Sequence, residues 1–439
     1  MQFCLSSLFL LSLVATWVSA APSPIRKRSF KVERVRNANF VGHNGPKELY
    51  KAYSKYSMPL PPGLLDAMRH PKAETEANDD GPKGPDQQPD CPCSLNSTIT
   101  GTNTTSSASS GSVEATPEDG DIEYLSPVTI GGQTVNLDFD SGSADLWVFN
   151  TQLAAKATVG HTLYDPTKSS TFNMLQGQIF SITYGDGSGA SGNVGTDVVE
   201  IGGVSVPNQA VELATKVTGS FIEDVNSNGL LGLAFSKLNT VQPQQQKTFF
   251  ENVLPTLAEP VFTADLRKEE TGAYEFGRID NTKFTGDITW IPVNTTNGFW
   301  QYGTSSFVVS GGENGTTEVQ QATPAQAIAD TGTTLMLVAQ EVSDAYYSQV
   351  SGAHNSDTEG GVVFPCDSVL PDLLIDVGGM YMAKIKGEDV NFAKIRGNTC
   401  FGGIQPTTSD LQIWGDIFFK SQFVVFNGGN NTLGMAEHA

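Results

Sequence analysis

The stretch at residues 135–149, VNLDFDSGSADLWVF, decides the fold, because residues 327–335, AIADTGTTL, repeat its pattern. In each copy an apolar run leads into an aspartate, which is followed by a hydroxyl residue, a glycine and a second hydroxyl residue. A single aspartate after a strand is usually only a turn residue or a helix cap. Two copies in one chain instead predict duplicated halves, with Asp140 and Asp330 each at the tip of a tight turn.

Two such aspartates can carry out acid and base chemistry together. If the halves face each other, the carboxylates share a proton, because two like charges at contact distance cannot both ionise. The ionised carboxylate takes a proton from a water that attacks a peptide carbonyl, while the other protonates the carbonyl oxygen. We therefore predict that Asp140 and Asp330 are catalytic, with no metal and no cofactor. The expected supporting residues are Ser141, Gly142, Ser143, Thr331, Gly332 and Thr333.

The two motifs, DSGSADLWVF from Asp140 and ADTGTTLML from Ala329, resemble the active-site signatures of pepsin-like aspartic endopeptidases. The motif sequences are most similar to those of the secreted fungal penicillopepsin and aspergillopepsin type. The similarity runs from about residue 121 to the C-terminus. This resemblance implies an all-β fold of two related barrel-like lobes with the active site in the cleft between them. Ser141 stands where threonine is commoner. Because serine keeps the hydroxyl, we expect the hydrogen bond between the lobes to survive, with less packing.

The rest of the chain agrees with an all-β fold. Short alternating runs broken by glycine, at 124–139, 180–203 and 286–293, are typical of strands, and brief helices are expected near 248–257 and 339–350. The internal duplication extends to GLLGLAF from Gly229 and QIWGDIFF around Gly415. In pepsin-like folds such a strand threads the loop that bears each aspartate.

Composition divides the chain into segments. Residues 1–20 read as a signal peptide, residues 21–72 form a basic prosegment, and residues 73–111 form a polar linker. The expected lobes are residues 112–300 with Asp140 and residues 301–439 with Asp330. We predict a secreted protein, with vacuolar retention left open. No later stretch is apolar for the ~18 residues that a membrane span needs, so no membrane association of the mature form is expected.

The charge is unevenly distributed. The net charge is −21, and residues 111–439 carry 14 Lys and Arg against 38 Asp and Glu. Such an acidic body excludes nucleic-acid binding through phosphates. Solubility and stability in acid are both open as reasons for this composition.

The basic segment suggests an intramolecular inhibitor. Residues 21–72 hold 11 Lys and Arg against 3 acidic residues, and residues 48–56, ELYKAYSKY, resemble the helix of a pepsin-type prosegment. The resemblance implies that Lys55 and Tyr56 block the catalytic aspartates. Acid would release the segment by protonating carboxylates on the body. No dibasic pair lies near residue 111, so we expect autocatalytic maturation near residues 111–115.

The resemblance also implies the substrate-binding residues. Residues 184–188, YGDGS, correspond to a flap in which Tyr184 hydrogen-bonds Trp147, and an acid at Asp186 leaves Lys open as the residue before the scissile bond. Phe221 and Leu231 fall where the family lines its first apolar pocket, although for Phe221 a core-packing role is equally open. The full set of expected flap and substrate-binding residues is Tyr184, Gly185, Asp186, Ser188, Trp147, Phe221, Leu231, Thr333 and Thr334.

Covalent features can also be assigned. Of five cysteines, Cys4 lies in the signal peptide and Cys91 and Cys93 lie in the linker without an assigned role. We predict that Cys366 and Cys400 form a disulfide, as the resemblance also implies. Glycosylation sequons occur at Asn96, Asn103, Asn294, Asn314 and Asn430.

Other functions fit the sequence less well. Glycoside hydrolysis also uses paired carboxylates. A glycosidase would be expected to have an aromatic-lined groove and to carry its carboxylates on unrelated segments, whereas the two aspartates here lie in repeated motifs. The histidines after the linker, His161, His354 and His438, form no H-E-x-x-H motif, and residues 224–235 imitate a calcium loop but end in Phe235. An inactive protease fold used for binding would be expected to have lost an aspartate, a motif glycine or the flap tyrosine, and this sequence keeps all of them. We therefore expect a monomeric, acid-activated aspartic endopeptidase, made as a zymogen, that cleaves extended polypeptides at large apolar residues.

Overall fold

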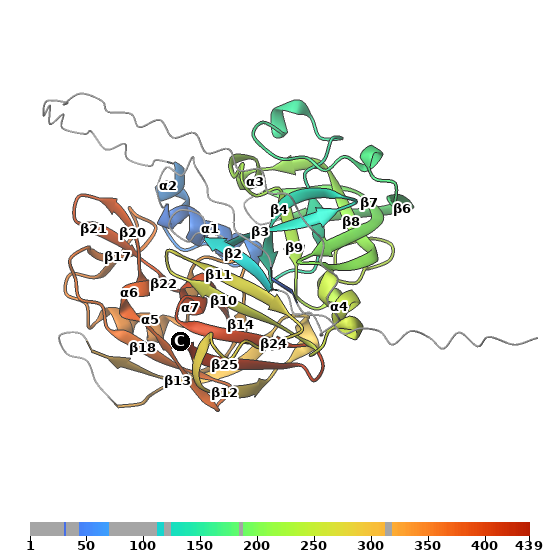
Figure 1. The fold of residues 1–439 in the computed structure, drawn as a ribbon. Helices are drawn as coiled ribbons and strands as arrows, with labels where there is room; N and C mark the ends of the chain where they lie inside the picture. Colours follow the sequence, from blue (N-terminus) through green and yellow to red (C-terminus); the bar gives the residue numbers. More distant parts are fainter. Residues whose placement is uncertain (1–29, 32–43, 70–111, 118–123, 184–187, 312–317) are drawn as a thin grey trace, which may run out of the picture.

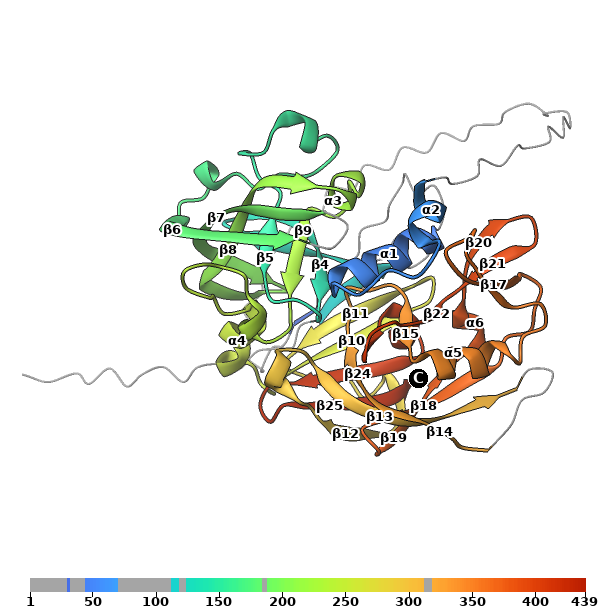
Figure 2. The ribbon, with the colours of Figure 1, turned by 180° about the vertical axis from the view of Figure 1, so that it is seen from behind.

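The computed structural model describes residues 30–31, 44–69, 112–117, 124–183, 188–311 and 318–439. The predicted signal peptide and linker, with Cys91 and Cys93, lie outside these residues. The described chain is built mainly of strands in two lobes, and a helix near the N-terminus lies between them (Figures 1 and 2). The expected all-β, bilobal fold is confirmed.

The first lobe is formed mainly by antiparallel strands. Strand β3 pairs with β4, β6 with β7, and β7 with β8. The strands are β2 (Ser112–Pro117), β3 (Tyr124–Ile130), β4 (Gln133–Asp140), β5 (Leu146–Val148), β6 (Asn173–Thr183), β7 (Gly189–Ile201), β8 (Val204–Thr218) and β9 (Gly229–Gly232). The helices are η1 (Ala155–Ala157), η2 (Pro166–Lys168), α3 (Ser220–Glu223), η3 (Ser236–Leu238), α4 (Phe249–Val253) and η4 (Leu254–Thr256).

A shared set of strands joins the lobes. Strands β10 (Val261–Arg267), β11 (Glu270–Phe276) and β12 (Phe284–Pro292) lie before the predicted boundary at residue 300. Strand β24 (Gln422–Asn427) pairs with β10, and β25 (Thr432–His438) pairs with β12. The end of the chain thus returns across that boundary, and these strands belong to the same 14-stranded sheet as the first lobe.

The second lobe begins with β13 and contains two further sheets. One sheet has seven strands: β13 (Gln301–Ser310), β14 (Gln320–Ala329), β15 (Met336–Val338), β18 (Asp372–Val377), β19 (Tyr381–Ile385), β22 (Ile404–Pro406) and β23 (Leu411–Trp414). The other has four: β16 (His354–Ser356), β17 (Gly361–Pro365), β20 (Asn391–Arg396) and β21 (Thr399–Gly402). The helices are η5 (Thr295–Asn297), α5 (Gln340–Tyr347), α6 (Gly387–Val390) and α7 (Asp416–Phe419).

Several local expectations are confirmed. Helices α4 and η4 fall within 248–257, and α5 falls within 339–350. Cys366 and Cys400 are disulfide-bonded, with their Cα atoms 4.9 Å apart. This bond ties the end of β17 to β21. Among the described residues, no helix is long and apolar enough to cross a membrane.

The duplicated motifs have the same topology in both lobes. Strand β9 pairs in parallel with β4 and antiparallel with β5, so it passes through the loop that carries Asp140. Strand β23 pairs in the same two ways with β14 and β15, around Asp330. A Cβ atom on Gly232 would lie 2.6 Å from the Cα of Ala144, and one on Gly415 would lie 2.0 Å from the carbonyl oxygen of Thr333. The expected threading is confirmed, and these close approaches show why glycine stands at both positions.

The N-terminal helix has a defined start and a buried face. Helix α1 (Gly45–Lys55) begins after Asn44, whose side chain accepts a hydrogen bond from the backbone N–H of Lys47 at 3.0 Å. Leu49, Ala52 and Tyr53 are buried against the body. Helix α2 (Leu64–Arg69) follows, and β1 (Phe30–Lys31) pairs with β11. The helix expected at 48–56 is confirmed, with its start three residues earlier.

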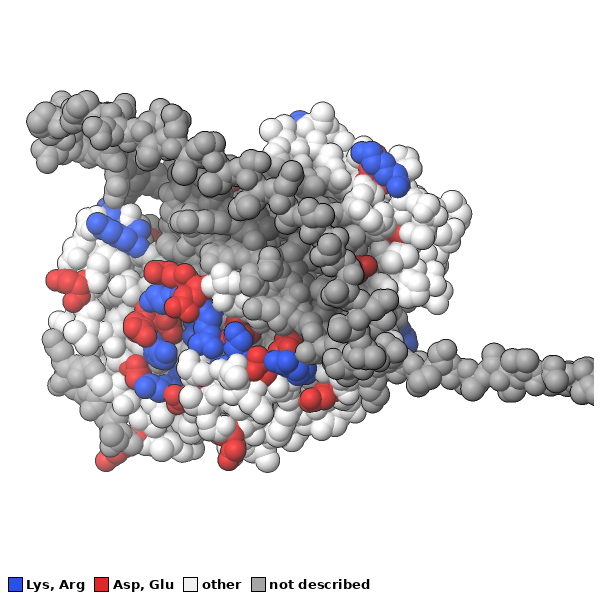
Figure 3. All heavy atoms as spheres, viewed as in Figure 1, with Lys and Arg blue, Asp and Glu red and all other residues white. Residues whose placement is uncertain are grey.

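Charged side chains are mixed on the face that Figure 3 shows. Lys and Arg lie beside Asp and Glu over the second lobe, while the first lobe shows few charges from this side. On the part of this face where described residues are visible, acidic and basic side chains are therefore intermixed.

Candidate active site

Both motif aspartates lie at the ends of buried strands. Asp140 is the last residue of β4 and Asp330 follows β14, and their side chains are 1% and 0% exposed. The backbone N–H of Gly142 and the hydroxyl of Ser143 donate to Asp140, at 2.8 and 2.5 Å. In the second copy the N–H of Gly332 donates to Asp330 at 3.1 Å, and the hydroxyl of Thr333 also donates to it. The two turns therefore hold their carboxyl groups in the same way.

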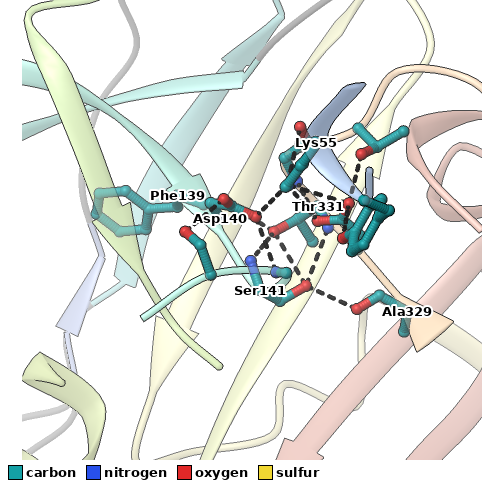
Figure 4. Close-up of polar contacts among 12 residues, drawn as sticks. Lys55, Phe139, Asp140, Ser141, Ala329 and Thr331 are labelled. Carbon is teal, nitrogen blue, oxygen red and sulfur yellow. Dashed lines mark hydrogen bonds and ion pairs between the residues drawn. The ribbon is translucent and has the colours of Figure 1, made fainter. Parts of the chain in front are cut away.

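Ser141 and Thr331 join the two turns across the lobes (Figure 4). The Ser141 hydroxyl donates to the carbonyl of Ala329 at 2.9 Å and accepts from the N–H of Thr331 at 2.9 Å. In return the Thr331 hydroxyl donates to the carbonyl of Phe139 at 2.6 Å and accepts from the N–H of Ser141 at 3.0 Å. The expectation that Ser141 keeps the hydrogen bond between the lobes is confirmed.

The motif glycines allow each carboxyl group to approach the opposite turn. A Cβ atom on Gly142 would lie 2.4 Å from Oδ1 of Asp330, and one on Gly332 would lie 2.4 Å from Oδ1 of Asp140. Real side-chain carbons do not come this close to other atoms. Any residue other than glycine would therefore push the two carboxyl groups apart.

Lys55 and Tyr56, at the end of α1, contact the two carboxyl groups, and Figure 4 shows Lys55 beside Asp140. The Lys55 ammonium is 2.7 Å from Oδ1 of Asp140, and 3.0 and 3.1 Å from the two oxygens of Asp330. The Tyr56 hydroxyl donates to Asp330 at 2.6 Å. The Lys55 side chain is only 11% exposed, so this ion pair is shielded from water.

The two carboxyl groups differ in their pKa values. Burial, together with the charge of Asp330, raises the pKa of Asp140 to about 6, although Lys55 opposes the shift. Burial also acts to raise the pKa of Asp330, but Lys55 and hydrogen bonds from Thr333 and Tyr56 outweigh it and hold that pKa below its usual range. One carboxyl group therefore keeps a proton more readily than the other, and a pair of carboxyl groups needs this difference to divide acid and base roles.

A cavity beside Asp140 collects four of the six predicted substrate-binding residues that the structure describes. It is bordered by Ser188, Phe221, Thr333 and Thr334, and α1 forms its other side. The Phe221 ring packs edge-on against Trp147, with the ring centroids 5.0 Å apart. Trp147 is 1% exposed and lies behind the cavity rather than on its surface.

One pocket residue is corrected. Leu231 is fully buried in the main core, and its neighbour Leu230 borders the cavity instead. Successive side chains of a strand point to opposite faces, so an error of one position reverses the side. Tyr184, Gly185 and Asp186 lie outside the described residues, as do Asn96, Asn103 and Asn314. The indole N–H of Trp147 has no hydrogen-bond partner within the described residues.

Two cavity residues were missed from the sequence. Asp138 precedes Asp140 by two positions on β4, is 4% exposed, and its Oδ1 has no hydrogen-bond partner in the described part of the chain. The period of two along a strand could have placed it beside Asp140. Glu48 of α1 accepts from the Thr334 hydroxyl at 3.2 Å and pairs with Lys51 at 3.3 Å. No sequence signal pointed to this contact.

The described residues contain no group of three or more His, Cys, Asp or Glu side chains placed to hold a metal ion. The site is instead a pair of buried carboxyl groups at the seam of two duplicated lobes. This combination defines a pepsin-like aspartic protease.

Comparison with known proteins agrees with that class. The family model described as eukaryotic aspartyl protease matches residues 123–438. The chain is 44% identical to an aspartic protease of Coccidioides posadasii over 98% of this chain and 94% of that protein. It is 42% identical to endothiapepsin of Cryphonectria parasitica, over 96% and 93% of the two chains. It is 47% identical to penicillopepsin-3 of Penicillium janthinellum, over 75% and 82%.

The chain therefore belongs to the eukaryotic aspartyl protease family. It is an aspartic endopeptidase of the pepsin-like, fungal type.

Proposed function

We propose that Asp140 and Asp330 form the catalytic dyad and hydrolyse internal peptide bonds through a water held between them. The carrying observation is that one ammonium group contacts both carboxyl groups, at 2.7 to 3.1 Å. A position within hydrogen-bond reach of both groups suits a water molecule once Lys55 has left. The ionised carboxylate then accepts a proton from this water as it attacks the peptide carbonyl, and the protonated partner donates to the carbonyl oxygen.

The pKa values support a division of roles within the dyad. With α1 in the cleft, the pKa of Asp140 is raised to about 6 and the pKa of Asp330 is lowered. These values include the effect of Lys55. After its removal the two carboxyl groups share one proton because they cannot both ionise at contact distance. Activity then requires acid, where that single proton is retained.

The chain is proposed to be a zymogen inhibited by residues 21–72. Helix α1 occupies the cleft between the lobes, and its Lys55, Tyr56 and Glu48 contact the dyad and Thr334. Acid releases the prosegment by acting on Asp330. With α1 in the cleft the pKa of Asp330 is lowered, so protonation of Asp330 favours the open state, in which α1 has left the cleft. We propose that the open enzyme then removes its own prosegment.

The substrate is proposed to be an extended polypeptide laid across the cleft as a strand. Phe221 and Leu230 give the cavity an apolar wall next to Asp140, which suits a large apolar residue before the scissile bond. Asp186 of the flap keeps Lys open as an alternative at that position. The flap residues lie outside the described chain, and their roles rest on the family resemblance.

Secretion and glycosylation complete the proposal. Asn294 and Asn430 are exposed, each at a turn, which suits glycan attachment. The signal peptide at residues 1–20 supports secretion, with the protein acting as a monomer without a cofactor. Vacuolar retention stays open.

The test separates the dyad from maturation. A specific protease site placed within residues 73–111 lets the prosegment be removed in every variant, whether or not it is active. Asp140→Asn and Asp330→Asn should each lower kcat on a denatured protein at about pH 3.5 by at least ~10³-fold, because each removes one half of the acid and base pair. Asp344→Asn, on the exposed face of α5, is the matched control. Full activity in either dyad variant would reject the assignment.

A further inference from the structure

His161 makes an unusual pair of contacts behind the substrate cavity. It lies in the connection between η1 and η2. Its Nδ1 is 3.1 Å from the carbonyl oxygen of Ser227, and its Nε2 is 3.3 Å from the carbonyl oxygen of Ile222. Both ring nitrogens therefore face groups that can only accept a hydrogen bond.

Only the charged form of histidine satisfies both contacts. A neutral imidazole carries one N–H, so its other nitrogen would present a lone pair to a carbonyl oxygen. The imidazolium carries two N–H groups and can donate to both. The ring is also stacked on Phe149, with centroids 3.8 Å apart and an angle of 11° between the planes, and a cation is favoured over an aromatic face.

The two carbonyls belong to the wall of the cavity, which we define as residues 220–227. Ser220, Phe221, Asp224 and Ser227 of this wall border the cavity. Ile222 lies in α3 and Ser227 lies just before β9, so the imidazole bridges the two ends of the wall. The wall side chain Phe221 also continues the ring stack, through Trp147, to Phe149. A change at His161 can thus reach the cavity by backbone and by side-chain contacts.

We propose that His161 is a positioning residue whose protonated ring holds residues 220–227 in place, so that binding of a large apolar substrate side chain depends on the charge of His161. The proposal rests on the proposed function only in treating this cavity as the substrate pocket. His161 does not border the cavity and is not in contact with Asp140 or Asp330. It acts through the wall.

The charged residues of the segments that meet at the ring are Glu223 and Asp224 on the wall, Lys156 in η1, and Asp165 in the connection that carries the ring. Glu223 also pairs with Lys47 of α1 at 2.8 Å, a contact that is lost when the prosegment leaves. When the imidazolium loses a proton, the ring can donate only one of its two hydrogen bonds, and the wall loosens.

The kinetic test uses the matured enzyme and His161→Phe, which retains an aromatic ring over Phe149 but cannot donate. With a peptide that has Phe before the scissile bond, we expect KM at pH 4 to rise about fivefold, with a smaller change in kcat, because the pocket binds substrate and transition state alike. With Ala at that position the rise should be absent. His354→Phe, at an exposed histidine on β16, is the matched control.

The pH profile distinguishes positioning from a purely structural role. Raising the pH from 4 should increase the wild-type KM for the Phe peptide more than it increases the KM of His161→Phe, because only the wild-type ring can lose a donated hydrogen bond. Equal KM values and equal profiles in the two enzymes would overturn the proposal. The melting temperature of each variant, measured at pH 4, shows whether it is folded.

A direct test does not depend on activity. In the full chain labelled with ¹⁵N-histidine, the resonances that His161→Phe removes identify this ring. At pH 4.5 both nitrogens should show the shifts of an imidazolium, and loosening of the wall should follow its titration. A ring that remains neutral at pH 4.5 would overturn the proposal even if the dyad assignment holds, whereas an inactive enzyme with a doubly protonated ring would reject only the dyad.

Discussion

At the residue scale, Lys55 is the side chain that contacts both motif carboxyl groups. Its ammonium lies on two buried carboxyl groups, which need a partner of opposite charge because an unpaired ion is costly to bury. Its contacts at 2.7 to 3.1 Å reach both lobes at once. The lysine therefore both occupies the position proposed for water and holds α1 in the cleft.

Replacing Lys55 with Met keeps the length and the apolar stem of the side chain but removes the charge. We expect Lys55→Met to weaken docking of the prosegment by about 3 kcal/mol, because two buried carboxyl groups lose their shared partner. The chain should then bind a statine-type inhibitor at pH 6, measured by calorimetry, where the wild-type chain does not. Lys47→Met, which removes only an exposed pair with Glu223, is expected to cost under about 1 kcal/mol. Equal inhibitor binding by the two variants would contradict this role of Lys55.

Much of the site could be predicted at this scale. The aspartates and their hydroxyl partners were found because each lies in a short motif whose chemistry is local, whereas Lys55 was implied by the resemblance of residues 48–56 to a pepsin-type prosegment helix. Asp138 and Glu48 were missed because their importance comes from what lies opposite them in the cleft. His161 was noted only as a histidine without a metal motif, since its two carbonyl partners are more than 60 residues away in sequence.

At the element scale, a second carboxyl pair lies behind the first active-site loop. Asp145, in the connection from β4 to β5, and Glu212 of β8 are 2% and 1% exposed and hydrogen-bonded to each other. The amide of Asn239 donates to both, at 3.0 Å each. Burial raises the pKa of both carboxyl groups, and the charge of Asp145 raises that of Glu212 further. Folding therefore favours the protonated form of these carboxyl groups, which links the stability of the lobe to pH.

The sign of this linkage favours acid. A carboxyl group whose pKa is raised by folding contributes stability that is complete below its unfolded pKa and is lost as the pH rises through its folded pKa. We expect Glu212→Gln, whose amide can donate permanently to Asp145, to move the pH midpoint of unfolding upward by about one unit. Circular dichroism between pH 5 and 9 measures it. Glu200→Gln, at an exposed position of β7, serves as control, and a midpoint unchanged by Glu212→Gln would refute the linkage.

The type of each element could be predicted from the sequence, but not always the side to which its side chains point. Threading of β9 and β23 was implied by the resemblance to pepsin-like folds, and the glycines at positions 232 and 415 fit it because a Cβ atom there would meet the backbone of the loop. The side on which Leu230 and Leu231 point depends on the exact pairing with β4 and β5, and the sequence of four apolar or small residues in β9 does not determine it. The face of a fully buried strand has no polar alternation to reveal it.

At the scale of the whole molecule, the two lobes are held at one seam by shared strands and by the Ser141 and Thr331 network. The duplication predicted two facing halves, and the structure agrees. It did not predict that β24 and β25 return to pair with β10 and β12, because pairing between distant strands leaves no local pattern. A division at residue 300 therefore does not separate two independent sheets.

The most direct measurement is to shift the intact, purified chain from pH 7 to about pH 3.5, below the ordinary aspartate pKa of ~3.9. Intact mass and digestion of a denatured protein are followed together, with Asp140→Asn in parallel. We predict that the wild-type chain is shortened near residues 111–115, becomes active and is blocked by a statine-type inhibitor. The Asp140→Asn chain, incubated by itself, should stay full-length and inactive. A wild-type chain that remains full-length and inactive, or a variant that matures equally, would contradict the account.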